Sequence, residues 1–172
     1  MLSKNIESVL NKQIRIEAES SQVYLSMACW AETQGLEGVA QFMYKQSDEE
    51  RMHMLKLVKY INERGGHAVV TDLKAPKTKF GTMKEMFEEL YNHELFVSDS
   101  INELVHGTFD EKDYATHNFL QWYVAEQIEE EAQAKTILDK INLIGDDKGG
   151  LYLFDRDIQQ MTGKDASAAN KN

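Results

Sequence analysis

The chain contains few residues that interrupt helices, few cysteines and no long apolar run. Its 172 residues include ten glycines and one proline, so long helices are possible and the positions of the breakers are informative. Cys29 is the only cysteine, which excludes an internal disulfide; we expect it to pack inertly beside the core. No segment approaches the roughly 18 apolar residues of a membrane span, and the first ten residues lack the apolar stretch of a signal peptide. The sequence therefore predicts a cytoplasmic protein without a membrane segment.

Positive charge is also scarce. Nineteen basic residues against 29 acidic ones give a formal net charge of -10 at pH 7. This balance argues against binding to nucleic acid through its phosphates and favours cations as ligands. The length suits one domain with a sizeable core, because 42% of the residues are hydrophobic.

The glycine and proline residues divide most of the chain into long helical segments. We expect four long helices, over residues 3–33, 36–64, 82–105 and 111–143. In each, apolar residues recur every three or four positions, which is typical of helices in a left-handed bundle. Ser3 is the expected N-cap of the first helix. Gly35 and Gly38 form a short turn, so the first two helices should run antiparallel.

Residues 65–81 lack a helical pattern and form a long connection. Extended, they can span roughly 55 Å at ~3.3 Å per residue, whereas a helix of about 26 residues is roughly 39 Å long. The connection can therefore cross the whole bundle, which would make the third helix parallel to the second. A short amphipathic helix near residues 151–161 must pack against an apolar partner to be stable. We expect one domain over residues 1–163 and a disordered tail over residues 164–172.

Polar residues occupy the middle of each apolar stripe. There are six of them: Glu17, Glu50, His53, Glu94, Gln127 and Glu130. Because the midpoints of bundled helices share one layer, these side chains should converge at mid-height in the core. Four carboxylates cannot all stay ionised there without compensating charge, and the stripes contain no Lys or Arg. Two divalent cations would supply that charge.

The ligand types indicate which metal. Carboxylates dominate, with one imidazole, one amide and no thiolate, which favours iron or manganese over structural zinc. Glu50 and His53 form a Glu-x-x-His pair on one helix face. Glu50 is central enough to bridge two ions.

On the basis of these residues, the chain resembles the bacterial non-haem ferritins over essentially its whole length. The resemblance rests on Glu17, Tyr24, the Glu49-Glu50-x-x-His53 run, Glu94 and the Glu126-Gln127-x-Glu129-Glu130 run. It implies an all-α, ferritin-like four-helix bundle with one long crossover and a short fifth C-terminal helix. It also implies a homo-oligomer, a 24-subunit shell with octahedral symmetry, in which the fifth helix packs around the four-fold axes.

The resemblance further implies roles for individual residues. Two irons per subunit would bind, one at Glu17, Glu50 and His53, the other at Glu50, Glu94 and Glu130 with Gln127 close by. A third iron position would use Glu49, Glu126, Glu129 and Glu130. Tyr24 would be a hydrogen-bonding neighbour of the centre and an electron donor.

One departure separates the chain from the bacterioferritins. That branch has a second Glu-x-x-His motif, where this chain has Gln127-x-x-Glu130. Bacterioferritins also bind haem through a methionine two residues before the ligand histidine, and Arg51 occupies that position here. We therefore expect no haem.

The expected function is that of a ferroxidase, which oxidises Fe(II) with dioxygen and stores the Fe(III) mineral in the shell. Two alternatives stay open at this point. One is a di-metal oxidase or peroxidase that acts on an organic substrate or on hydrogen peroxide. The other is a structural bundle with protonated core carboxylates, which would keep its stability without metal and would be stabilised by Glu94→Leu.

Overall fold

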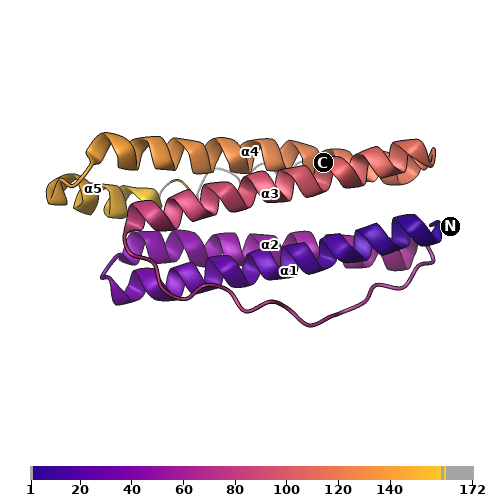
Figure 1. Cartoon of the computed structure of the whole chain (residues 1–172), viewed down its shortest axis with the longest axis horizontal. Coiled ribbons are helices and arrows are strands. Elements are labelled where there is room, and N and C mark those ends of the chain that lie inside the picture. Colours follow the sequence, from indigo (N-terminus) through magenta and orange to yellow (C-terminus); the bar gives the residue numbers. More distant parts are fainter. Residues whose placement is uncertain (1, 160, 162–172) are drawn as a thin grey trace.

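The computed structural model describes residues 2–159 and 161, and those residues form five helices and no strands. The helices are α1 (Lys4–Thr33), α2 (Glu37–Glu63), α3 (Met83–Asp110), α4 (Tyr114–Ile144) and α5 (Lys148–Ile158). Four long helices lie side by side as a bundle, and the short α5 packs at one end (Figure 1). The predicted all-α bundle with a short fifth helix is confirmed. The tail expected over residues 164–172 lies outside the described residues.

The long connection between α2 and α3 runs along the outside of α1 from one end of the bundle to the other (Figure 1). Hydrogen bonds hold it there at both ends: Asn11 Nδ2 donates to the His67 carbonyl oxygen at 3.0 Å, and Ser26 Oγ donates to the Lys77 carbonyl oxygen at 2.7 Å. The crossover therefore returns the chain to the end of the bundle where α2 begins. As predicted, α3 runs parallel to α2 (Figure 1).

Most helix N-termini are capped by the side chain of the residue directly before the helix. Ser3, Thr82, Asp113 and Asp147 each accept a hydrogen bond from a backbone N–H in the first turn that follows. Leu36 precedes α2 and supplies no such bond. Asp155 of α5 does so instead, because its Oδ1 accepts from the Val39 backbone N–H at 2.9 Å. The docked α5 thus completes the N-terminus of α2.

Close packing between α5 and α2 depends on Gly38. A Cβ atom at this position would lie 1.7 Å from the Asp155 carbonyl oxygen, so any side chain would push the two elements apart. Phe154 and Ile158 of the same helix are buried in the core. The fifth helix is therefore an integral part of the bundle end.

Three helices end in the same way. Gly35, Gly65 and Lys112 each adopt a positive φ, and the next residue's N–H bonds a carbonyl five residues back. The expected end of the third helix at residue 105 is wrong, because α3 continues through Gly107 to Asp110. The true stop is Lys112, a lysine in a conformation that usually selects glycine.

The core consists of two apolar clusters, one towards each end of the bundle. One includes Phe42, Phe87 and the α5 residue Phe154. The other includes Leu10 and Leu57. The polar stripe residues lie between them. Cys29 is exposed, so the expectation that it packs beside the core is wrong. None of the helices in the described part of the chain is long and apolar enough to cross a membrane.

Candidate metal centre

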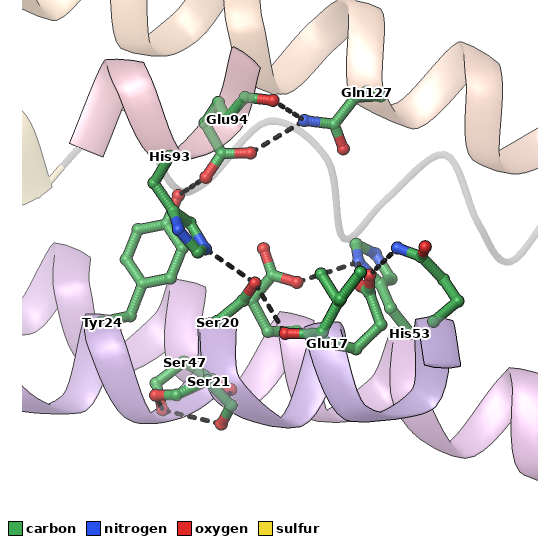
Figure 2. Close-up of polar contacts among 12 residues, drawn as sticks. Glu17, Ser20, Ser21, Tyr24, Ser47, His53, His93, Glu94 and Gln127 are labelled. Carbon is green, nitrogen blue, oxygen red and sulfur yellow. Dashed lines mark hydrogen bonds and ion pairs between the residues drawn. The ribbon is translucent and has the colours of Figure 1, made fainter. Parts of the chain in front are cut away.

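The mid-height layer of the bundle contains the six polar stripe residues, and all of them are buried. They are Glu17 on α1, Glu50 and His53 on α2, Glu94 on α3, and Gln127 and Glu130 on α4. Glu17 and Glu94 are fully inaccessible, and Glu130, the least buried, is 8% exposed. Figure 2 shows side chains from separate helices directed towards the same space. A layer of this kind between two apolar clusters needs a balancing charge.

Two groups of these side chains have the spacing of metal ligands. Glu17, Glu50 and His53 offer one ligand atom each within 4.8 Å of one another. Glu50, Glu94 and Glu130 do the same. Glu50 belongs to both groups, which is the position that a residue bridging two ions would take. The specific ligand assignment stays a prediction.

Protein hydrogen bonds orient Glu94. The Tyr24 hydroxyl donates to its Oε1 at 2.5 Å, and Gln127 Nε2 donates to its Oε2 at 2.8 Å (Figure 2). The Gln127 amide also donates to the Glu94 backbone carbonyl at 3.2 Å. Tyr24 and Gln127 therefore act on the centre through Glu94, which explains why an amide stands at position 127 beside carboxylates.

A buried amide that the sequence analysis missed orients Glu17. Gln13 is 1% exposed, and its Nε2 donates to Glu17 Oε1 at 2.7 Å. The Ser100 hydroxyl on α3 donates in turn to Gln13 Oε1 at 2.7 Å. The signal available in the sequence was the i, i+4 spacing of Gln13 and Glu17, which places both on one face of α1.

Several buried ligand atoms lack a hydrogen-bond partner among the described residues. They are Glu17 Oε2, both carboxylate oxygens of Glu50, His53 Nδ1, Gln127 Oε1 and Glu130 Oε1. His53 Nδ1 lies 3.7 Å from Glu17 Oε2 and 3.6 Å from Glu50 Oε2. Buried polar atoms are rarely left unpaired, so a concentration of them around one space is the donor set that a cation would satisfy.

The electrostatics of the layer favour bound protons when no cation is present. Burial, together with the neighbouring carboxylates, raises the pKa of Glu50 and of Glu130 well above 4.5. Burial lowers the pKa of His53, but Glu17 and Glu130 outweigh it and the pKa is raised above 6.5. Burial and the charge of Glu94 raise the pKa of the Tyr24 hydroxyl. A metal that binds here must therefore displace protons.

The residues expected at a third iron position are only partly brought together. Glu49 and Glu126 are half-buried, and each offers an oxygen within 4.8 Å of a His53 nitrogen and of the other. Glu129 is exposed and belongs to none of the ligand groups found among the described residues, and Glu130 groups with Glu50 and Glu94. The geometry thus favours His53 as the partner of Glu49 and Glu126.

Aromatic side chains close one side of the layer. The Trp122 and Tyr123 rings stack at 4.6 Å, and each lies between 5 and 6 Å from the His53 ring: 5.5 Å for Trp122 and 5.6 Å for Tyr123. The Lys56 ammonium lies 3.3 Å from the centre of the Trp122 ring. This packing fixes the orientation of the His53 imidazole.

The chain is similar to known proteins along nearly its whole length. Residues 7–144 match the family model described as a ferritin-like domain. A probable bacterial non-heme ferritin-like protein of Haemophilus influenzae is 46% identical over 164 residues, covering 95% of this chain and 99% of the relative. A bacterial non-heme ferritin of Campylobacter jejuni is 44% identical over 161 residues, covering 94% and 96%.

A solved structure is similar to the chain in both sequence and fold. The open pore ferritin of the hyperthermophilic archaeon Archaeoglobus fulgidus is 42% identical and superposes with a TM-score of 0.91, covering 92% of this chain and 98% of the other.

Proposed function

The chain belongs to the ferritin family of iron-storage proteins, and we propose that it is a ferroxidase subunit that oxidises Fe(II) with dioxygen at the mid-height layer. The single observation that supports this most is the pair of buried ligand groups that share Glu50. A structural bundle has no need for six convergent polar side chains in its core, five of them with unpaired atoms.

In this proposal iron is the substrate. One Fe(II) binds at Glu17, Glu50 and His53, and the other binds at Glu50, Glu94 and Glu130, with Gln127 orienting Glu94. Four carboxylates balance the charge of two ferrous ions. Each Fe(II) gives up one electron, and dioxygen accepts both. The protein holds the two ions close together, and its few ligands per ion leave positions open for dioxygen or water.

A third iron position is part of the same proposal. The half-buried pair Glu49 and Glu126, with His53, supports it, because three ligand atoms lie within 4.8 Å of one another. Glu129 and Glu130 would contribute from the rim of this position. Tyr24, as a buried phenol hydrogen-bonded to a ligand, is the proposed electron donor.

We further propose that the subunits form a cytoplasmic, 24-subunit shell with octahedral symmetry, which holds the Fe(III) mineral. The helix α5 supports association, since Tyr152 is 70% exposed and Leu153 is also exposed on it, and Leu143 near the end of α4 is exposed as well. The net charge of -10 per chain would draw Fe(II) towards such an assembly.

The test is aerobic addition of Fe(II) to metal-free protein, followed by the absorbance of Fe(III) at increasing ratios of iron to subunit. Wild type, Glu50→Ala and His53→Ala are compared, with Glu63→Ala as the matched control because that glutamate lies on the same helix, is exposed and belongs to none of the ligand groups among the described residues. Light scattering gives the size of each assembly.

We expect fast oxidation in wild type with a break near two or three irons per subunit, and continued uptake without precipitation in a large assembly. Glu50→Ala and His53→Ala should lose the fast phase, while Glu63→Ala keeps it. Equal rates in all four proteins would refute the centre. Fast oxidation in a small oligomer that lets iron precipitate would instead favour a di-metal oxidase.

A further inference from the structure

Gln13 joins a metal-ligand candidate to a neighbouring helix. Its Nε2 donates to Glu17 Oε1 at 2.7 Å, and its Oε1 accepts from the Ser100 hydroxyl on α3 at 2.7 Å. The amide is 1% exposed and forms the floor of a groove of about 440 Å³ between α1 and α3. Both ends of this buried amide are therefore occupied, and its position is fixed from two helices.

The two partners also determine which end of the amide faces Glu17. Were the amide turned over, its carbonyl oxygen would face the Glu17 carboxylate, and two acceptors would meet. In the orientation found here, the Gln13 N–H meets the Glu17 carboxylate and the Ser100 hydroxyl donates to the amide carbonyl oxygen. The Glu17 carboxylate thus selects the N–H end of the amide, because a hydroxyl such as that of Ser100 can bond either end, and Ser100 anchors the opposite end.

The consequence for Glu17 is that its two oxygens are not equivalent. Oε1 accepts the Gln13 hydrogen bond, whereas Oε2 has no hydrogen-bond partner among the described residues and lies 3.7 Å from His53 Nδ1. Glu94 has both oxygens hydrogen-bonded, and Glu50 has neither. Of these three carboxylates, only Glu17 is held with one oxygen engaged and one free.

We propose that Gln13, locked by Ser100, is a positioning residue that keeps Glu17 a one-oxygen ligand. This inference rests on the ferroxidase centre proposed above. A carboxylate without such a partner can turn and bind a cation through both oxygens, which fills one more coordination position. By engaging Oε1, Gln13 leaves that position open for dioxygen on the ion shared by Glu17, Glu50 and His53. Hydrogen bonds to ligands orient metal sites in general.

The test uses Co(II), which binds oxygen and nitrogen ligands and whose visible absorption weakens as its coordination number increases. Metal-free full-length wild type, Gln13→Leu and Ser100→Ala are titrated with Co(II) without oxygen, and Fe(II) oxidation is measured separately. Ser21→Ala is the matched control, because it removes another buried contact between helices, the 2.8 Å hydrogen bond to the Ser47 carbonyl, and touches no ligand.

We expect Gln13→Leu to weaken the Co(II) absorption per bound ion and to slow Fe(II) oxidation about 10-fold, the lower end of the effect of removing such a partner. Ser100→Ala should also weaken the Co(II) absorption and slow Fe(II) oxidation, but by smaller amounts. This variant keeps the proposal testable if Gln13→Leu does not fold. Ser21→Ala should lower the thermal midpoint and leave the Co(II) spectrum unchanged.

Two outcomes would overturn the proposal. If Gln13→Leu and Ser100→Ala lose thermal stability as Ser21→Ala does but keep the wild-type Co(II) spectrum, Gln13 serves only to join α1 to α3. If wild type itself shows no Co(II) binding that Glu50→Ala abolishes, the centre fails, and the role of Gln13 fails with it.

Discussion

The Tyr24 hydroxyl and the Glu94 carboxylate are joined by a 2.5 Å hydrogen bond between α1 and α3 in the buried layer of the bundle. Gln127 binds the other oxygen of the same carboxylate from α4. Glu94 is thus held by the protein itself. Glu50 lies in the same layer, 1% exposed, and neither of its oxygens has a hydrogen-bond partner among the described residues.

Replacing these two glutamates by leucine should have opposite effects on the metal-free protein. Glu50→Leu removes two buried unpaired oxygens, so it should raise the free energy of unfolding by about 1–3 kcal/mol. Glu94→Leu leaves the Tyr24 hydroxyl and the Gln127 amide unpaired, so it should lower it by a similar amount. Urea unfolding with a chelator measures both; equal signs would contradict the assignment of partners. Each variant should lose fast Fe(II) oxidation.

Removing only the Tyr24 hydroxyl should impair the centre through Glu94. Tyr24→Phe keeps the ring and deletes the donor to Glu94 Oε1, so Fe(II) oxidation should slow several-fold and the metal-free protein should lose about 1–3 kcal/mol of stability. Stopped-flow absorbance gives the rate. Tyr91→Phe, a half-buried tyrosine on the same helix as Glu94, is the control and should leave the rate unchanged. An unaltered rate in Tyr24→Phe would exclude the positioning role.

The stability of the metal-free protein should fall as pH rises from about 5 to 8. The folded state raises the pKa of Glu50 and Glu130 well above 4.5, so in this window it holds protons that the unfolded chain releases. His53 acts with the same sign, because its pKa is raised above 6.5 and its contribution is lost as pH rises through the folded value.

The measurement is urea unfolding with a chelator at several pH values. Glu50→Gln should flatten the decline, since it removes one of these groups. Bound Co(II) should reverse it, because the metal competes with the protons. A stability that rises with pH in the chelated wild type would show that the layer is ionised without metal.

The contact between α5 and α2 should matter for stability. Asp155→Ala removes the hydrogen bond to the Val39 N–H and should cost about 0.5–2 kcal/mol, the usual range for a lost N-cap. Asp157→Ala, an exposed aspartate two residues away, is the control and should cost much less. Thermal unfolding of the two variants compares them. A loss in Asp157→Ala equal to that in Asp155→Ala would mean that the cap contributes nothing.

The periodicity of the sequence was sufficient to predict the core and the polar layer. The stripe that passes through Glu94 on α3 is buried at every predicted position, because a three-and-four spacing can face only one direction on a helix. The crossover was predictable from its length, since the extended connection can span more than the length of a helix in the bundle. Tyr60 near the end of α2 and Ile144 at the end of α4 continue the same spacing but are only half-buried, because neighbouring helices cover the ends of the bundle less completely.

Helix ends were predictable only where glycine marks them. Gly35 and Gly65 stop α1 and α2 in the left-handed conformation, as expected from residues without a side chain. The same stop after α3 uses Lys112, whose side chain carries no such signal, while Gly107 lies within the helix with open space beside it. Sequence reasoning therefore placed the break at the wrong residue.

Contacts between helices were the least accessible to prediction. Gln13 is recognisable as a neighbour of Glu17 from its spacing, but its bond to Ser100 depends on how close α1 lies to α3. The same limit applies to Glu129, which shares a run of acidic residues with Glu130 yet faces solvent. A run of adjacent glutamates on a helix points in several directions, and only the packed bundle selects among them.

The cap that Asp155 provides for α2 has a consequence for the order of events during translation. The second helix is synthesised before the residue that completes its N-terminus, because that residue lies in α5, which follows α3 and α4 along the chain. Until then the first turn of α2 has no side-chain cap, and the surface that Phe154 later covers is open to water. The nascent chain can form its hairpins in sequence, but this end of the bundle closes only after α5 has been synthesised.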